Sequence, residues 1–531
     1  MPYKSFSLTL FENGFFRPLT YLFHTSFIAT LFFISLSFIS LCLAEPQEKS
    51  TFSKKWVGTW SSAPQLVETA NNPPSPGLSN NTIRQIVHPS IGGDSLRIRF
   101  SNEFSKSPVV MNSVHIAISK GNGTIDTTTD KVIYFGGLQK ITMEPDSAVM
   151  SDPFQFALPP LTDVAITIYF GSTSPDITGH PGSRTTSYIL TGNNVSTADF
   201  STAVTTQHWY VINTIEVLTS DSANAVAILG DSITDGRGSD TDKQDRWPDE
   251  LAIRLQANNN TRETAVLNEG IGGNCVLGFC LGPSALNRFQ RDVLNQNGVK
   301  WLIILEGIND IGGAYGSQGS TQTAQNLIAA YGQFIDEAHV AKILVYGATL
   351  LPFGGSSYDS PDHQTAWQTV NDWIRHSRRF DAVIDFDSTM HDPTDTTKLL
   401  SIYDSGDHLH PSETGHQRMA ETVDLTLFDN GITTVINEKA VNIQNRFSLL
   451  QNYPNPFNPS TIISFSIQKA GKVRITIYNQ LGQQVALVTN KEYQAGNYSI
   501  NFNAASLASG VYYYRIISDS FSQTKKMILL K

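Results

Sequence analysis

The chain has 531 residues, of which 40% are hydrophobic, 10% aromatic and 16% charged, and its net charge at pH 7 is -10. This length exceeds what one hydrophobic core organises and predicts about two to four globular regions. The negative charge argues against a nucleic acid as partner, because no basic field is present to displace counterions from phosphates.

The first 44 residues have the features of a signal peptide. Lys4 and Arg17 precede an apolar run over residues 21–43, and Cys42 and Ala44 place small side chains where a signal peptidase reads the chain. The alternative is an uncleaved membrane anchor, because the run is nearly long enough to span a bilayer. A lipid anchor on Cys42 is disfavoured by the bulky residue before it.

Residues 52–220 predict an N-terminal β-sandwich domain. Short alternating runs, such as residues 95–100 and 164–170, are separated by clusters of Gly, Pro, Asn and Asp. No helical period is visible in this part. Residues 180–184 (HPGSR) have two interpretations, a structural loop or a flap that covers an active site and binds substrate.

Residues 224–428 change to an alternation of strands and helices. Apolar strand candidates lie at residues 225–229, 265–267, 301–305, 343–346 and 382–385. One helix is expected to begin near Trp247, with Pro248 in its first turn, where the missing N–H costs nothing. Another is expected over residues 321–339. This alternation predicts a parallel sheet that helices cover on both faces.

The remainder of the chain returns to β-structure. After a linker at residues 429–446, residues 447–531 contain strictly alternating runs, such as 472–478, and are enough for about seven short strands in a small sandwich. This composition alone is compatible with a binding domain.

Signal cleavage would leave two cysteines, Cys275 and Cys280, five residues apart in a Gly-rich loop. In an oxidising compartment these two can form a local disulfide, and two free thiols are the alternative. Without a matching pair of histidines they do not predict a zinc site.

The segment around Ser232 carries the strongest chemical signal. An apolar run ends at Gly-Asp-Ser, which places the Ser232 hydroxyl at the carboxyl end of a strand, where parallel sheets gather functional residues. His410 lies near the end of the same region and could accept the serine proton. Asp407, three residues before it, could hold the imidazole in the required tautomer. The three residue types together predict nucleophilic catalysis.

Two further strand ends offer hydrogen-bond donors. Gly273 offers a backbone N–H and Asn309 a side-chain amide, and with the N–H of Ser232 they could stabilise a developing oxyanion. Each motif alone is compatible with an ordinary turn or helix cap. Their common position at strand ends favours a single site.

These motifs resemble those of the SGNH hydrolases, also called the GDSL esterase family. The matching segments are GDSITDG with Ser232, NEGIGGN with Gly273, GIND with Asn309 and DHLHPS with His410, and Asp407 completes a triad. The resemblance covers about residues 224–428 and implies an α/β fold, a three-layer αβα sandwich with a five-stranded parallel sheet. The flanking RWPDELA resembles a branch related to a rumen xylanase-cluster esterase, which also carries an N-terminal β-domain.

Residues 447–531 resemble the type A sorting domain of the type IX secretion system. The similarity runs from NYPNPFNPST through VRITIYNQLGQQV and AGNYSINFNAASLASGVYYYRI to the basic KKMILLK. It implies a Gram-negative cell in which the signal peptide delivers the chain to the periplasm. The tail would then direct it across the outer membrane, to the medium or to the cell surface.

Together these resemblances imply a secreted serine esterase that hydrolyses carboxylic esters through Ser232, His410, Asp407 and an acyl-enzyme. Short acyl groups, acetyl first, are expected, with plant polysaccharides as candidate substrates. No cofactor and no metal are expected. The expected partners are the ester substrate and the type IX secretion machinery, without nucleic acid or a membrane span after signal cleavage. The alternatives are a broad arylesterase or lysophospholipase, and a non-catalytic carbohydrate-binding surface protein.

Overall fold

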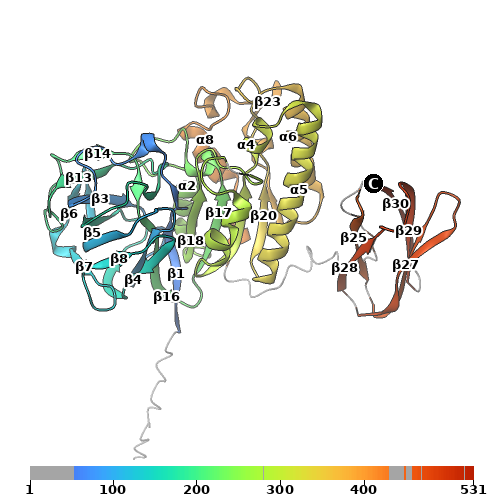
Figure 1. Ribbon diagram of the computed structural model, residues 1–531, viewed down its shortest axis with the longest axis horizontal. Helices are drawn as coiled ribbons and strands as arrows, with labels where there is room; N and C mark the ends of the chain where they lie inside the picture. The colour runs from blue at the N-terminus through green and yellow to red at the C-terminus, as the bar shows by residue number, and fades with distance from the viewer. Residues whose placement is uncertain are drawn as a thin grey trace, which may run out of the picture. The chain divides into compact units, whose positions relative to one another are not determined.

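The computed structural model describes residues 53–278 and 280–429 and, nearer the C-terminus, 448–449, 452, 457–467, 469–494, 496–518 and 521–530. The predicted signal peptide lies outside the described residues, as does the predicted linker apart from its first residue. Figure 1 shows three kinds of region along the chain, an N-terminal β-region, a central α/β-region and a C-terminal β-region.

The N-terminal β-region contains two large antiparallel sheets and a small one. One sheet has the order β1-β16-β4-β10 with β9 on β4, the second has β14-β13-β3-β11-β5-β6 with β7 and β8 on β5, and the third has β15-β12-β2. The strands are β1 (Lys54–Ser61), β2 (Gln65–Leu66), β3 (Asn81–Val87), β4 (Gly93–Asn102), β5 (Val109–Gly121), β6 (Thr124–Ile125), β7 (Lys131–Ile133), β8 (Ile141–Met143), β9 (Ser147–Met150), β10 (Phe154–Leu158), β11 (Val164–Phe170), β12 (Thr178–His180), β13 (Ser187–Thr191), β14 (Val204–Thr206), β15 (Trp209–Tyr210) and β16 (Ile212–Ser220). Two short 3-10 helices, η1 (Thr69–Asn71) and η2 (Thr127–Thr129), interrupt them.

The two large sheets of this region share one core, as a sandwich requires. Ile98 from β4 and Ile168 from β11 are completely buried in the same apolar cluster. The alternating runs in the sequence therefore place their apolar side chains between the sheets and their polar side chains outside.

The central α/β-region is built on a five-stranded, all-parallel sheet with the order β18-β17-β19-β20-β21, which confirms the expected sheet. Its strands are β17 (Asn224–Gly230), β18 (Thr264–Gly270), β19 (Val299–Leu305), β20 (Leu344–Ala348) and β21 (Ala382–Ile384). The helices are α1 (Ser232–Asp235), α2 (Trp247–Ala257), α3 (Ala285–Phe289), α4 (Ile308–Gly312), α5 (Gly316–Val340), α6 (Pro361–His376), α7 (Phe386–Met390) and α8 (Glu413–Thr422). Shorter elements are η3 (Gln290–Leu294), the hairpin β22 (His391–Asp392) and β23 (Asp395–Leu399), η4 (Ser401–Tyr403) and η5 (Leu425–Phe428).

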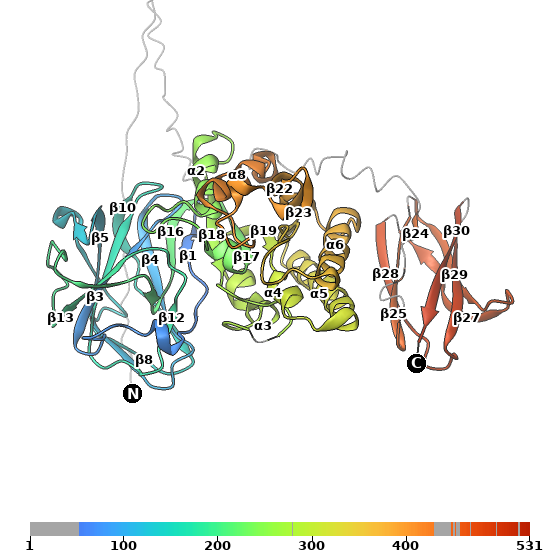
Figure 2. The same cartoon turned by 90° about the horizontal axis from the view of Figure 1, so that it is seen from above.

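Helices cover both faces of this sheet. In Figure 2, α2 and α8 lie on one side of β17 to β19, and α3 and α5 lie on the other. The chain leaves β17 first toward β18 and later returns to add β19 on the opposite side of β17. This reversal of strand order opens a crevice at the carboxyl ends of the strands, where open α/β sheets bind ligands.

The N-terminal β-region packs directly against the α/β-region. Leu267 of β18 belongs to the same buried cluster as the sandwich core. The N–H of Gly58 donates to the carbonyl of Asn297 at 2.9 Å, and the N–H of Val266 donates to Ser90 Oγ at 3.0 Å. The two regions therefore share a buried apolar cluster and are also joined by hydrogen bonds.

The C-terminal β-region forms two antiparallel sheets, with the orders β24-β25-β28 and β27-β26-β29-β30. Its strands are β24 (Ser448–Leu449), β25 (Ser460–Ile467), β26 (Gly471–Tyr478), β27 (Gln484–Tyr493), β28 (Gly496–Asn503), β29 (Gly510–Ser518) and β30 (Phe521–Leu529). Ile463 and Ile475, one from each sheet, are fully buried in a shared core. A small sandwich is therefore present, as the alternating sequence predicted.

Candidate active site

Ser232 lies where β17 ends and α1 begins. The strand is buried along nearly its whole length, as expected for a parallel strand covered on both faces. The Asp231 carboxylate caps the following turn by accepting a hydrogen bond from the N–H of Ile233 at 3.0 Å. Burial raises the pKa of Asp231 to about 8. Ser232 itself remains 9% exposed and borders a cavity.

His410 and Asp407 lie on the loop that precedes α8 and meet Ser232 there. His410 Nε2 lies 2.8 Å from Ser232 Oγ, and His410 Nδ1 lies 2.7 Å from Asp407 Oδ2. The other carboxylate oxygen of Asp407 accepts the N–H groups of His410 at 2.9 Å and of Leu409 at 3.1 Å. The carboxylate is thus anchored to its own loop and can hold Nδ1–H, which leaves Nε2 to accept a proton from Ser232.

The pKa values of this histidine and aspartate are both below their usual values. Burial lowers the pKa of His410, Asp407 raises it, and the guanidinium groups of Arg237 and Arg184 lower it again. Burial acts to raise the pKa of Asp407, but hydrogen bonds from His410 and Leu409 hold it at about 2. At neutral pH, Asp407 is therefore ionised and His410 is neutral, the state that a general base requires.

A second histidine of the same loop makes a useful contrast. His408 Nδ1 lies 2.5 Å from Asp404 Oδ2, so it also has a carboxylate partner. Its side chain is 55% exposed, and it is not among the residues that line the cavity beside Ser232. The structure therefore brings His410 to the serine and leaves His408 at the surface.

The three predicted oxyanion donors border the same cavity. Gly273 follows β18, and Asn309 lies in the first turn of α4 after β19. Asn309 Oδ1 accepts the hydroxyl of Tyr358 at 2.9 Å, while Nδ2 donates to the carbonyl of Asn274 at 2.8 Å and keeps a second N–H. Within the described residues, the backbone N–H groups of Ser232 and Gly273 donate to no protein acceptor. The site thus offers three donors to a ligand oxygen.

The loop that carries Gly273 has little freedom. Gly273 has a φ of +70°, a conformation that favours glycine, and a Cβ there would approach Leu281 Cδ1 to 2.8 Å and require that side chain to shift. A disulfide joins Cys275 and Cys280, which decides between the two possibilities that the sequence left open. The half-buried Asp310 carboxylate accepts the N–H of Val276 at 2.8 Å and also the next N–H along the chain, at 3.0 Å. Disulfide and carboxylate together fix the loop.

A buried charge network lies beneath the strand ends. The completely buried Arg288 donates to the carbonyl of Gly230 at 2.9 Å, to that of Glu269 at 2.5 Å and to the side chain of Asn274 at 3.0 Å. Glu306 and Asp292 balance its charge at 3.2 and 3.3 Å. Burial raises the pKa of Glu306 to about 7, although Arg288 acts to lower it. One side chain therefore links the ends of β17 and β18 to the Gly273 loop.

The cavity beside Ser232 has a volume of about 460 Å³ and walls from both regions. The α/β-region contributes Ser232, Asp235, Arg237, Gly272, Gly273, Leu281, Asn309, Tyr358, Leu409 and His410, and the N-terminal β-region contributes Gln65, Glu68, Asn71, Pro181, Gly182, Arg184 and His208. The loop 180–184 thus lies against the cavity. No motif pointed to Gln65, Glu68 or Tyr358, because each of them reaches the cavity only through folding of segments that are distant in the chain.

His180 connects the two walls. Its Nδ1 lies 2.9 Å from the carbonyl oxygen of Ala63, and its Nε2 lies 2.8 Å from Asp235 Oδ1, on the turn that begins with Ser232. Because a carbonyl only accepts, Nδ1–H is the donor to Ala63, and Nε2 faces the Asp235 carboxylate. Both side chains are buried. His180 thereby joins the N-terminal β-region to the turn that begins with Ser232.

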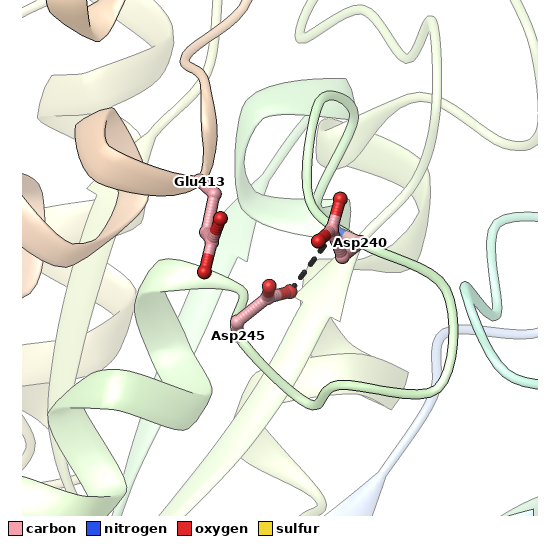
Figure 3. A group of neighbouring side chains, drawn as sticks. All are labelled: Asp240, Asp245 and Glu413. Atoms are coloured by element: carbon pink, nitrogen blue, oxygen red, sulfur yellow. Dashed lines mark hydrogen bonds between the residues drawn. The ribbon is translucent and has the colours of Figure 1, made fainter.

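One acidic cluster of the described residues could hold a cation. Asp240, Asp245 and Glu413 bring one carboxylate oxygen each to within 4.8 Å of the others (Figure 3). Asp245 is buried and accepts the N–H of Asp240 at 3.1 Å, and burial raises its pKa, with Asp240 and Glu413 adding to the effect. None of the three lines the cavity beside Ser232.

Comparison with known families finds two matches along the chain. Residues 228–418 match the GDSL-like lipase/acylhydrolase family, and residues 451–530 match the secretion system C-terminal sorting domain. The first match contains Ser232, Gly273, Asn309, Asp407 and His410. No curated protein matches the chain.

Several solved structures resemble part of the chain. Acetylxylan esterase Axe2 from Geobacillus stearothermophilus is 21% identical, with 39% of this chain and 94% of that chain covered and a TM-score of 0.30. The acetyl xylan esterase AlAXEase is 18% identical, with 37% and 96% covered and a TM-score of 0.29. A GDSL-like lipase from Bacteroides thetaiotaomicron is 18% identical, with 41% and 89% covered and a TM-score of 0.28. At such identities and TM-scores, the activities of these proteins do not transfer to this chain.

Proposed function

Because residues 228–418 belong to the GDSL-like lipase/acylhydrolase family, we propose that this chain is a serine esterase with Ser232 as nucleophile, His410 as general base and Asp407 as its partner. The sorting domain at residues 451–530 indicates secretion across the outer membrane. No helix in the described part of the chain is long and apolar enough to cross a membrane.

The reaction would proceed by acyl transfer to Ser232. Its Oγ attacks the ester carbonyl carbon while its proton passes to His410 Nε2, and Asp407 stabilises the imidazolium that forms. The carbonyl oxygen becomes an oxyanion that the N–H groups of Ser232 and Gly273 and the amide of Asn309 can stabilise. Collapse of this tetrahedral intermediate expels the alcohol, which takes the proton from His410. Water then repeats the sequence on the acyl-enzyme and releases the acid.

The contact between Ser232 Oγ and His410 Nε2 at 2.8 Å, continued to Asp407 at 2.7 Å, is the observation that carries this proposal. The proposed nucleophile, base and orienting carboxylate are linked by consecutive hydrogen bonds, and the backbone N–H groups of Ser232 and Gly273 lie beside the same cavity without a protein acceptor among the described residues. This arrangement serves nucleophilic catalysis and has no evident structural purpose at a half-open cavity.

The walls of the cavity favour a short acyl group and a polar alcohol. Most lining side chains are polar, such as Gln65, Asn71 and His208, and the few aliphatic ones include Leu281 and Leu409. A long acyl chain needs a continuous apolar channel to release its hydration water. We therefore propose acetyl or similarly short esters, with polysaccharides as candidate substrates, in preference to lysophospholipids.

Replacement of the nucleophile tests this proposal. The purified mature chain should hydrolyse p-nitrophenyl acetate, and Ser232→Ala should lower kcat/KM at least about 10³-fold, because no other group can form the acyl-enzyme. Ser317→Ala, at an exposed serine at the start of α5, should match the wild type. Equal rates for wild type and Ser232→Ala would refute the esterase proposal and favour the carbohydrate-binding alternative.

A further inference from the structure

Two arginines border the cavity without an acidic partner. Arg184 comes from the N-terminal β-region and Arg237 from the turn after Ser232, and both line the cavity. Among the described residues, neither guanidinium makes an ion pair or a hydrogen bond, and the Nε of Arg184 is buried without an acceptor. A buried N–H that has lost water and gained no acceptor is costly, which points to a ligand as its partner.

The acidic side chains of the same cavity, Glu68 and Asp235, bond to groups other than the two arginines, and Asp235 Oδ2 is buried without a hydrogen-bond partner. Glu68 accepts hydrogen bonds from Gln65 Nε2 at 2.6 Å and from Asn71 Nδ2 at 3.0 Å. Asp235 is bound by His180 at 2.8 Å. The cavity therefore holds two guanidinium charges that its own carboxylates do not pair with.

The backbone of Arg184 is held in a fixed conformation. Arg184 has a positive φ of 49°, which is uncommon for a residue with a side chain and persists only where the surroundings enforce it. Its carbonyl accepts the N–H of Asp242 at 2.9 Å, and the Asp242 carboxylate binds both the N–H and the hydroxyl of Thr186 at 2.6 Å. The flanking Ser183 and Thr185 are buried. These hydrogen bonds and the buried neighbouring side chains therefore hold the backbone of Arg184 in place.

Arg237 is held from the catalytic side. Its N–H donates to the carbonyl of Ser232 at 2.8 Å, and its carbonyl lies 3.1 Å from Nε2 of the buried His416. Burial lowers the pKa of His416 to about 4, so the imidazole is neutral. Its Nδ1 accepts the N–H of Trp247 at 3.3 Å, which leaves Nε2–H to donate to Arg237. The backbone of Arg237 is therefore fixed relative to the nucleophile.

Both guanidinium charges act on the base. They lower the pKa of His410 and so disfavour the imidazolium that must form during acyl transfer. A negative group bound between the arginines would cancel this effect at the moment of reaction. An anionic substrate would thus both satisfy the arginines and assist His410.

We propose that Arg184 and Arg237 form an anion subsite, and that the substrate is a short-acyl ester that also carries a carboxylate, as acetylated sugar chains with uronic acid residues do. This inference rests on the proposed esterase function. Arginine suits the role because its planar fork binds a carboxylate through two parallel hydrogen bonds. The polar walls of the cavity favour a sugar-linked carboxylate over the phosphate of a lipid. The N-terminal β-region then contributes directly to substrate selection.

Matched pairs of esters test the subsite. On the alcohol side, we compare acetylated xylo-oligosaccharides with and without a glucuronic acid branch. On the acyl side, we compare p-nitrophenyl hemisuccinate with p-nitrophenyl butyrate, which differ by a carboxylate at similar length. The wild type should favour the charged member of the alcohol-side pair. A preference confined to the acyl-side pair would overturn the sugar-linked carboxylate and place the anion on the acyl group.

Variants connect the preference to the two arginines. Arg184→Gln and Arg237→Gln should each lower the ratio of kcat/KM for the charged member to that for the neutral member by about 10- to 100-fold, the effect of losing a charge-assisted hydrogen bond. Arg184→Lys and Arg237→Lys should keep part of the ratio. Arg262→Gln removes the same charge from an exposed position outside the cavity and should leave the ratio unchanged.

The outcomes separate the two proposals. An unchanged ratio in both Gln variants, or a wild type that favours the neutral member of both pairs or a lysophospholipid, would overturn the anion subsite while leaving the esterase intact. A wild type that hydrolyses no ester faster than Ser232→Ala would overturn the esterase itself. If Arg184→Gln fails to fold, the exposed Arg237→Gln decides the question alone.

Discussion

The α/β-region and the N-terminal β-region contribute to one cavity in different ways. The α/β-region supplies the groups of the proposed reaction: Ser232, Gly273 and Asn309 follow the carboxyl ends of parallel strands, and His410 lies on the loop before α8. The β-region supplies a polar wall from loops between antiparallel strands. In the proposed account, the reacting groups and the groups that select the substrate therefore come from separate parts of the chain, which meet only after folding.

The largest expected effect divides two neighbouring histidines of the α/β-region. His410→Asn should lower kcat/KM for p-nitrophenyl acetate at least about 10³-fold, because the serine loses its base. His408→Asn is the matched control, since His408 also has an aspartate partner but lies outside the cavity, and asparagine tolerates its positive φ of 61°. Steady-state kinetics on both variants measure this. A greater loss of activity in His408→Asn than in His410→Asn would contradict the assignment of His410 as the base.

The next largest expected effect concerns the buried ion pairs of Arg288 beneath the strand ends of the α/β-region. Arg288→Met should lower the free energy of unfolding by about 3 to 5 kcal/mol, because it leaves Glu306 buried without its cation, while Asp292 keeps its ion pair with Arg291. Arg379→Met, which breaks an ion pair with Asp336 at the surface, should cost about 1 kcal/mol or less. Urea unfolding of both variants gives the comparison. Similar losses would mean that the buried network does not support the strand ends.

A smaller effect is expected where the two regions are joined. His180→Gln removes the contact with Asp235 on the nucleophile turn and should lower kcat/KM about 10-fold through misplacement of Ser232. His115→Gln is the control, because His115 pairs with Asp130 at 3.0 Å within the β-region and does not line the cavity beside Ser232. If both variants keep full activity, the β-region contributes a wall but does not position the nucleophile.

The smallest expected effect is a shift in the pH profile. Burial lowers the pKa of His410, as do Arg237 and Arg184, whereas Asp407 raises it. Protonation removes the base, so activity on a neutral ester should be lost as the pH falls through a value below the usual 6.5 of histidine. In the double variant Arg184→Gln/Arg237→Gln, this acid limb should move to higher pH. An acid limb that stays in place would show that the two charges do not reach His410.

The fold could be predicted from the sequence where local pattern and packing agree. All five parallel strands lie within a few residues of the apolar runs that predicted them, because strands buried on both faces need continuous apolar sequence. Helix α5 begins at Gly316, earlier than the predicted residue 321, because its first turn is rich in Gly and Ser and gives no helical signal of its own. Tertiary packing extends the helix where propensity does not.

The candidate site was predictable in its reacting groups and not in its surroundings. Ser232, Gly273 and Asn309 follow strand ends, and that position has a recognisable sequence context. Tyr358, which orients Asn309 from 49 residues away, and Gln65, which is farther still, have no such context. Arg184 lies in the loop 180–184, for which the sequence left two interpretations open, and only the folded structure shows that this loop borders the cavity beside Ser232.

Covalent labelling tests the central claim most directly. The full-length mature protein would be incubated with a fluorophosphonate, which phosphonylates activated serines, and the adduct would be located by peptide mass spectrometry while residual esterase activity is followed. We predict one adduct on Ser232, formed in step with the loss of activity and absent when His410 is replaced by asparagine. Complete inactivation with the adduct on another residue, or undiminished hydrolysis by protein fully labelled at Ser232, would contradict the account.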